Sequence, residues 1–370
     1  MNKRLLRLHG LINFHAGYFY GQAHGGLSFF IPNFKGVLDM KRMLGFIAVI
    51  VIFLGYAFFT ETNSQVTQKG QVKEVGLLQL MDQPALKQIQ KGIYAGLEES
   101  GYKVGKNLKV DYQNAQGNQS NLKTMSEKFV NENVDLAIGI TTPASISLAN
   151  ATSSTPILMG AVTDPKGAEL VQNLNQPEKN ITGVSDQAPL EEQLGLIKEL
   201  MPKMKTLGII YTSSDNSAVT QYKKFKKLAD AAGVKTKAYS ISNSNDLNQV
   251  SQTMVQEVDA VFVPTDNTIA GAMSTLIKNA DAAKVPVFPT VDSMVKDGGV
   301  ATYSVNQYKL GVLTGQMAAK ILKGQKVKNT PVEFIKHGDL TINTKQAAEL
   351  GVKIPAKLLA EAEKNGEVFK

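Results

Sequence analysis

The sequence contains no cysteine, no tryptophan and, among its 370 residues, only four histidines. The lack of cysteine excludes disulfide bonds, thiolate metal sites, iron–sulfur clusters, thiol catalysis and a membrane anchor on a lipid-modified cysteine. Three histidines lie within the first 24 residues, so only His337 is left for the rest of the chain. A Ser-His-Asp relay or a multi-histidine zinc site therefore cannot form after residue 60, except around His337. We expect no enzymatic activity, no metal and no cofactor.

Arginine is also scarce, and its three copies all lie in the first 42 residues. The later chain therefore has no guanidinium fork for a phosphate or a carboxylate, and no glycine-rich phosphate-binding loop opens any of its helices. The formal net charge is +8, and residues 1–60 carry a net five of these charges. The remainder is spread over a lysine-rich and acid-rich body without a nucleic-acid-binding motif, which predicts no nucleic-acid partner.

An apolar run at 43–60 follows Lys41 and Arg42 near the amino terminus. As a helix, this run would span about 27 Å, just short of the ~30 Å hydrocarbon core of a bilayer. Basic residues precede the run and none follows it closely, so the positive-inside rule places residues 61–370 outside the cell. The run has no good A-x-A cleavage pattern. We therefore expect residues 40–60 to form one uncleaved membrane helix, a signal anchor, with a cleaved signal as the alternative.

The segments on either side of this run are expected to lack a fold of their own. Residues 1–39 are rich in glycine, phenylalanine and histidine and have no clear period, which predicts a disordered cytoplasmic tail or a spurious extension. Residues 61–73 are a polar linker. The globular body is therefore expected to begin at residue 74.

The body alternates short apolar strands with amphipathic helices, the pattern of an α/β protein with parallel sheets. Strands that read as unbroken apolar runs are covered by helices on both faces. The predicted strands are 75–80, 108–112, 135–140, 157–162, 206–211, 235–241, 260–263, 285–288 and 300–303. The predicted helices are 84–100, 120–131, 144–151, 190–201, 218–232, 246–256, 269–283 and 307–323.

An internal similarity divides this body into two halves. The segment 134–144 resembles 258–268, at an offset of 124 residues, and a similar helix entry precedes each of them. We therefore predict a first lobe at 74–185 and a second lobe at 186–305. Residues 306–370 are expected to form a crossover helix and terminal elements that complete the lobes.

Ligands of open parallel sheets bind at the carboxyl ends of the strands. Two predicted helix starts, at 142–145 and 266–268, occupy such positions in the two halves, and their free N–H groups would suit a carboxylate. Plain helix capping by Thr142 and Asp266 is the alternative. For a ligand ammonium, Asp164 and Asp292 are the leading candidates among the acids that follow strands, although either could be a turn or cap residue. Lys166 remains a rival for the carboxylate.

At these positions the chain resembles the substrate-binding proteins of ABC importers, and within them the tryptophan/tyrosine-type amino-acid binders. The similarity covers 74 to about 355. It is carried by DQPALKQIQKGIYAGLEESGY (82–102), NAQGNQSNL (114–122), TPASISLANAT (142–152), AVTDPKGAELV (161–171), ITGVSDQAPLEEQLGLIKELMP (181–202), VPTDNTIAGAM (263–273) and YSVNQYKLG (303–311). The resemblance implies a periplasmic-binding-protein-like fold of type I, with two Rossmann-like lobes joined by a hinge and the ligand between them.

The strand ends and the resemblance together give the candidate ligand-binding residues. They are Asp82, Thr142, Ala144, Ser145, Thr163, Asp164, Ser185, Asp186, Asp266, Asn267, Thr268, Asp292, Asn306 and Tyr308. Tyr303, Tyr308 and Phe288 are possible walls for a ligand side chain, with core packing as the alternative.

The resemblance implies a monomeric, extracellular receptor that binds a free amino acid of the aromatic, tryptophan- or tyrosine-like kind by hinge closure and delivers it to a permease. The predicted membrane helix would replace the lipidated cysteine that tethers many relatives. A ligand-sensing ectodomain on the same scaffold, or a binder of another small solute such as a sugar, remains the alternative. The histidine and cysteine content argues against an enzyme.

Overall fold

The computed structural model describes residues 50–52, 72–335 and 337–370. The segments 1–39 and 61–71, and most of the apolar run 43–60, lie outside these residues. Within the described part of the chain, no helix is both long enough and apolar enough to cross a membrane. The membrane helix therefore stays a prediction. Residues 72–370 fall within one compact unit, Lys69–Lys370.

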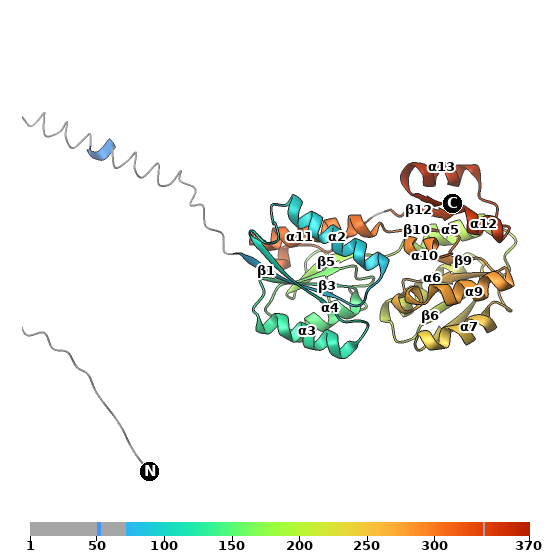
Figure 1. Ribbon diagram of the computed structural model, residues 1–370, viewed down its shortest axis with the longest axis horizontal. Helices are drawn as coiled ribbons and strands as arrows, with labels where there is room; N and C mark the ends of the chain where they lie inside the picture. Colours follow the sequence, from blue (N-terminus) through green and yellow to red (C-terminus); the bar gives the residue numbers. More distant parts are fainter. Residues whose placement is uncertain (1–49, 53–71, 336) are drawn as a thin grey trace, which may run out of the picture. The chain divides into compact units, whose positions relative to one another are not determined.

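The first lobe is built on a six-stranded parallel sheet with the order β11-β5-β4-β3-β1-β2. Helices α2 and α11 pack on one face of this sheet, and α3 and α4 pack on the other (Figure 1). The strands are β1 (Lys73–Gln79), β2 (Leu108–Asn114), β3 (Leu136–Ile140), β4 (Ile157–Gly160), β5 (Ile181–Ser185) and β11 (Glu333–Phe334). The helices are α2 (Pro84–Glu99), α3 (Gln119–Asn131), α4 (Thr142–Ala151) and α11 (Gln307–Leu322).

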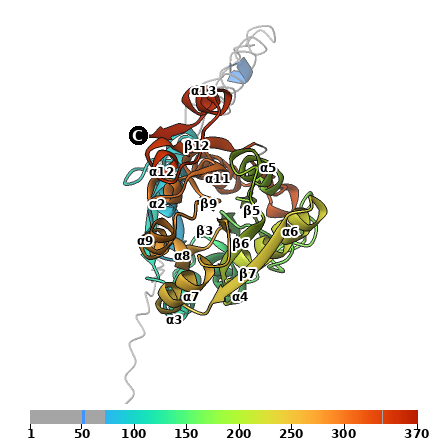
Figure 2. The ribbon, with the colours of Figure 1, turned by 90° about the vertical axis from the view of Figure 1, so that its right-hand side faces the viewer.

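The second lobe holds a parallel sheet, β7-β6-β8-β9, and a three-stranded sheet, β10-β12-β13, in which β10 and β12 are antiparallel. Figure 2 shows β12, α12, α13 and the carboxyl terminus together at one end of this lobe. The strands are β6 (Thr206–Thr212), β7 (Lys235–Ile241), β8 (Ala260–Val263), β9 (Val287–Pro289), β10 (Ala301–Ser304), β12 (Asp339–Asn343) and β13 (Glu367–Phe369). The helices are α5 (Leu190–Leu200), α6 (Asn216–Ala231), α7 (Leu247–Met254), α8 (Asn267–Gly271), α9 (Met273–Ala283), α10 (Asp292–Lys296), α12 (Thr344–Glu349) and α13 (Ala356–Asn365). Two 3₁₀ turns, η1 (Ser244–Asp246) and η2 (Val327–Asn329), complete the elements.

Two cores fill the second lobe, because successive side chains of each strand point to opposite faces of the sheet. Ile209 and Phe262 pack with α5 and α6, whereas Ile210 and Val261 pack with α7 and α9. The chain passes between the lobes three times, after β5, after β10 and after β11. The α/β class with parallel sheets is therefore confirmed.

Each predicted strand and helix of the body is present, with small shifts at its ends. The predicted helix 269–283 is divided, because Ala272 leaves the helical conformation with φ −122° between α8 and α9. Strands β5, β11, β12 and β13 were not predicted individually. In β5, Gly183 has φ +152° and packs its Cα against the backbone of Met159. The other residues of β5 include Thr182 and Ser185, so only Ile181 and Val184 are apolar and the strand has no apolar run by which to identify it.

Helices α2 and α11 cross at unusually close range because glycines line both of them. A Cβ atom on Gly92 or Gly96 would overlap the backbone of α11, and one on Gly311 or Gly315 would overlap the backbone of α2. This crossing fixes the position of α2, whose first turn faces the second lobe.

We predict that Gly311→Ala destabilises the protein by about 1–3 kcal/mol, because a buried methyl group forces two packed backbones apart. Gly195→Ala is the matched control, since Gly195 lies in α5 with open space around its Cβ position. Alanine there should stabilise the protein by about 0.5–1 kcal/mol through helix propensity. Denaturant unfolding of both variants decides the matter, and equal effects would contradict the close crossing.

Candidate functional site

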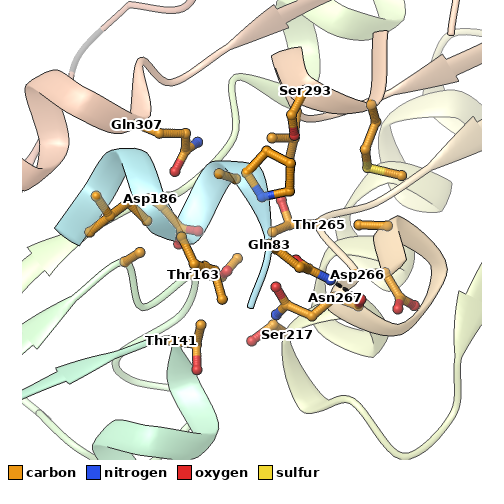
Figure 3. Close-up of a pocket in the computed structure, with 18 of the residues that line it drawn as sticks. Gln83, Thr141, Thr163, Asp186, Ser217, Thr265, Asp266, Asn267, Ser293 and Gln307 are labelled. Carbon is orange, nitrogen blue, oxygen red and sulfur yellow. Dashed lines mark hydrogen bonds between the residues drawn. The ribbon is translucent and has the colours of Figure 1, made fainter. Parts of the chain in front are cut away.

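A cavity lies between the two lobes, at the carboxyl ends of β3, β4, β5 and β8 (Figure 3). It encloses about 660 Å³ of empty space, including the part that is open to solvent. Among the described residues, those that line it include no lysine, arginine or histidine. They are Gln83, Pro84, Ala85, Leu86, Ile89, Thr141, Thr142, Ala161, Thr163, Asp186, Ser217, Thr265, Asp266, Asn267, Ala270, Val291, Ser293, Met294, Asp297 and Gln307.

Asp186 supplies an unpaired carboxylate to this cavity. It follows β5 directly, at the first passage between the lobes, and it is 9% exposed. Its Oδ1 atom is buried and has no hydrogen-bond partner among the described residues. Burial raises the pKa of Asp186 to about 6, although a hydrogen bond with Thr163 works in the opposite direction. This carboxylate is therefore largely desolvated without a counter-charge.

A second unpaired group lies at the start of α4. The Thr141 hydroxyl is buried and has no partner in the described part of the chain. Thr141 also adopts φ +91° and ψ +161°, a backbone region that is otherwise almost restricted to glycine. The strained residue turns the chain from β3 into α4. In the first turn, the N–H of Thr142 has no helical partner and lies at the cavity, whereas Pro143 has no N–H and the Ser145 N–H bonds to the Thr141 carbonyl. The helix dipole and the unpaired hydroxyl together suit an anion.

Asp266 lines the same cavity, but its carboxylate is occupied. It accepts hydrogen bonds from the Thr212 backbone at 2.6 Å and from the Thr212 hydroxyl at 2.9 Å. It also accepts from the N–H groups of Thr268 and Ile269, both at 3.0 Å, and so caps α8. Burial raises the pKa of Asp266, and these hydrogen bonds lower it. The N–H groups at this helix start are therefore used by a cap rather than held free, as the alternative interpretation expected.

Polar contacts join the lobes across the cleft at three points. The Thr142 and Ser217 hydroxyls are 2.8 Å apart. Lys224 pairs with Asp164, with 3.1 Å between Nζ and Oδ2. The Gln83 amide donates to the carbonyl of Asn267, and Figure 3 marks this bond. The two lobes are thus bridged directly by side chains, and we refer to this arrangement as the closed cleft.

Five of the fourteen predicted residues line the cavity: Thr142, Thr163, Asp186, Asp266 and Asn267. The other nine lie outside its lining: Asp82, Ala144, Ser145, Asp164, Ser185, Thr268, Asp292, Asn306 and Tyr308. Tyr303 and Phe288 are outside it as well, and Phe288 packs in the core of the second lobe.

Most of these nine residues have local structural partners. Asp82 is exposed and pairs with Lys87 at 3.0 Å. The Ser145 hydroxyl donates to the carbonyl of Gly139 beneath α4. Asn306 caps α11.

Of the remaining six, Asp164 pairs with Lys224, as described above, and the other five do not reach the cavity either. Ala144 is fully buried in the first lobe, and Tyr308 is 44% exposed. The Ser185 hydroxyl accepts from the N–H of Gln187, and the Thr268 N–H serves the cap of α8. Burial raises the pKa of Asp292, which accepts a hydrogen bond from the N–H of Ser293.

Several lining residues escaped the prediction although their neighbours in sequence were chosen. Gln307 lies between Asn306 and Tyr308, and Ser293 follows Asp292. Ser217 comes from the start of α6, where Asp215 provides a cap that the sequence could have revealed. The carboxyl of Asp215 is also perturbed, since burial and the nearby Asp266 raise its pKa to about 6.

Comparison with known proteins identifies the family to which the chain belongs. Residues 74–365 match the family described as ABC transporter substrate binding protein. The "Tyrosine-binding protein" of Clostridioides difficile (strain R20291) is 35% identical over 281 residues, which cover 76% of this chain and 81% of that protein.

Two solved structures extend the similarity over the whole body. The ABC domain from Streptococcus pneumonia in complex with L-Trp is 41% identical, with a TM-score of 0.77, over 80% of this chain and 99% of that chain. A substrate-binding protein with adhesive properties from Clostridium difficile, in a ligand-free, open structure, is 35% identical, with a TM-score of 0.65. The match covers 81% of this chain and 99% of that chain. The resemblance found in the sequence is thus confirmed. The chain belongs to the ABC transporter substrate-binding proteins, which act outside the cytoplasm.

Proposed function

We propose that this protein binds a free amino acid with an aromatic side chain and delivers it to the permease of an ABC importer. The observation that carries the proposal is the unpaired Asp186 carboxylate in a cavity whose described lining contains no cation. A ligand ammonium would supply the missing counter-charge, and no bond in the ligand would be made or broken.

The ligand carboxylate would bind at the start of α4. The Thr141 hydroxyl and the Thr142 N–H are neutral donors, and the helix dipole favours a negative charge beside them. This assignment keeps the role expected for this helix start but moves the ammonium partner from Asp164 or Asp292 to Asp186. Asp164 is engaged with Lys224, and Asp292 lies outside the lining.

The side chain of the ligand would occupy the apolar part of the cavity. Leu86 and Ile89 of α2 face it from the first lobe, and Val291 and Met294 face it from the second. The named ligands of the two relatives are tyrosine and L-Trp, and identities of 35% and 41% support an aromatic ligand here. A sugar, the alternative ligand, would leave the Asp186 carboxylate without a counter-charge.

The same proposal extends to the organisation of the whole chain. The lobes at 74–185 and 186–305, completed by 306–370, would close over the ligand about the three connecting segments. The apolar run 43–60 would anchor a monomeric receptor on the outer face of the membrane, close to its permease. A signalling ectodomain on the same scaffold is the second candidate, and it would require a cytoplasmic partner for its output.

A screen of the twenty amino acids by thermal shift tests the ligand class. We predict stabilisation by tryptophan, tyrosine or phenylalanine, because a ligand at a hundred times its Kd adds about 2.7 kcal/mol. Sugars serve as the control compounds. Stabilisation by a sugar, with no shift from any amino acid, would contradict the proposal.

Asp186→Asn should abolish tight binding and also stabilise the ligand-free protein at neutral pH. Loss of the charge partner of a buried ammonium weakens binding by about 2–5 kcal/mol. Burial raises the pKa of Asp186 to about 6, above the ~3.9 of an unfolded aspartate. The folded state therefore holds this proton more tightly, and stability falls as the pH rises from about 4 through about 6.

The asparagine side chain does not ionise, so Asp186→Asn should remove the part of the pH dependence of stability that Asp186 causes. The Asp186→Asn protein should be more stable than the parent by roughly 1–3 kcal/mol at pH 7. Denaturant unfolding between pH 4 and 8 and titration calorimetry measure the two effects. Asp82→Asn is the control, because Asp82 is exposed and lies outside the cavity. An Asp186→Asn protein that binds like the parent would refute the assigned role.

Lys224→Ala should speed ligand release, because it removes the ion pair with Asp164 that spans the closed cleft. Lys224 does not line the cavity, so the substitution removes no contact with the ligand. Both side chains are partly exposed, so the effect is small, about 0.3–1 kcal/mol or a two- to five-fold faster release. Lys226→Ala is the matched control on the same helix, where Lys226 pairs with Asp230 within the second lobe. Stopped-flow release rates that are equal in the two variants would exclude a role for the pair in closure.

A further inference from the structure

We infer that Ser293 and Asp297 accept a hydrogen bond from the ring of the ligand, and that they select rings carrying a polar hydrogen. The inference rests on the proposed function and names the substrate subclass of the same cavity. Both residues lie at α10, which forms part of the second-lobe wall.

The position of α10 places these residues at the side-chain end of the cavity. Helix α10 contacts α2 across the cleft, and Ala85 of α2 packs against the second-lobe core that contains Met294. The apolar lining lies between these two helices. In Figure 3, Ser293 lies across the cavity from Thr141 and Thr163, which flank the site proposed for the charged end of the ligand.

The polar side chains of Ser217, Thr265 and Asp266 in the second-lobe wall are already engaged. The Thr265 hydroxyl bonds with Gln221 at 3.0 Å and with the Thr290 hydroxyl at 3.1 Å. The Asp266 carboxylate accepts four hydrogen bonds, and the Ser217 hydroxyl donates to Thr142.

The Ser293 hydroxyl and the Asp297 carboxylate, in contrast, have no hydrogen-bond or ion-pair partner within the described residues. The side chain of Asn267 is also uncommitted, but Figure 3 draws it, like Ser217, toward the Thr141 side of the cavity and away from Ser293. It therefore belongs to the end of the cavity that receives the ligand carboxylate. Ser293 and Asp297 are left as the acceptors at the opposite end.

The two ligands named for relatives share a chemical feature beyond an aromatic ring. Tyrosine has a phenolic O–H and tryptophan an indole N–H, whereas phenylalanine has no polar hydrogen on its ring. An ionised carboxylate only accepts hydrogen bonds, and bonds to it are stronger than neutral ones. A site that hydrogen-bonds a ligand group discriminates against the analogue that lacks it. Asp297 is exposed to solvent and Ser293 is half-buried, so we expect a preference of about ten- to a hundredfold rather than the larger one of a fully buried site.

The test is titration calorimetry of the full-length protein with L-tyrosine, L-tryptophan, L-phenylalanine and L-lysine. The parent should bind tyrosine or tryptophan at least tenfold more tightly than phenylalanine. In Asp297→Ala with Ser293→Ala, the affinity for the preferred ligand should fall to that for phenylalanine, whose own affinity should change less than twofold. Lys296→Ala, on the same helix but outside the lining, should leave all ratios unchanged.

Equal losses for all three aromatic ligands, or an unchanged ratio, would overturn the inference. Tighter binding of L-lysine than of any aromatic ligand would also overturn it, because Asp297 would then pair with a cation. If the double variant does not fold, Ser293→Ala alone provides the same comparison of ratios. Absence of binding by any amino acid to the parent would instead overturn the proposed function.

Discussion

Removing a carboxylate from water costs several kcal/mol unless hydrogen bonds or a counter-charge replace its hydration. Asp186 is buried, its Oδ1 atom has no partner, and no cation lines the described cavity around it. A stable fold tolerates such a group where function requires it. In our account the ligand ammonium completes this site, so the ligand-free protein carries an electrostatic cost that binding removes.

The fold places Asp186 where such a group can act on both lobes. It stands at the end of β5, on the first of the three segments that connect the lobes. The glycine-lined crossing of α2 and α11 holds the first turn of α2 against the cavity. The contacts of Thr142 with Ser217 and of Asp164 with Lys224 join the first lobe to the second across the cleft. The contacts between the lobes, the buried Asp186 carboxylate and the apolar side chains of α2 therefore all lie at the same cavity.

The positions of the helices and strands could be predicted because apolar runs and amphipathic periods are local properties of the sequence. Strand β5 was missed because its sequence, ITGVS, has only two apolar side chains, those of Ile181 and Val184, and so forms no apolar run. The site was predicted to the level of the strand ends and helix starts, and five of the chosen residues line the cavity. Successive residues of a helix point about 100° apart, so Gln307 lines the cavity while its neighbours Asn306 and Tyr308 do not.

Other features of the site depend on the packing of the two lobes, which local patterns do not contain. The sequence identified Asp164 as an acid after a strand, but its pairing with Lys224, 60 residues away, arises from the closed cleft. The burial that distinguishes Asp186 from Asp164 and Asp292 arises in the same way. Sequence reasoning could therefore name the acids near the ligand but could not choose among them.

The most direct test of the central claim is the number of protons released when the ligand binds. Burial raises the pKa of ligand-free Asp186 to about 6, so this carboxyl is largely protonated at pH 5, and pairing with an ammonium requires it to ionise. Calorimetric titration with L-tyrosine or L-tryptophan at pH 5, in buffers of different ionisation enthalpy, should show release of close to one proton. Asp186→Asn, titrated at ligand concentrations high enough to saturate its weakened site, should release none. Binding by the parent protein without proton release at pH 5 would contradict an ammonium–Asp186 pair.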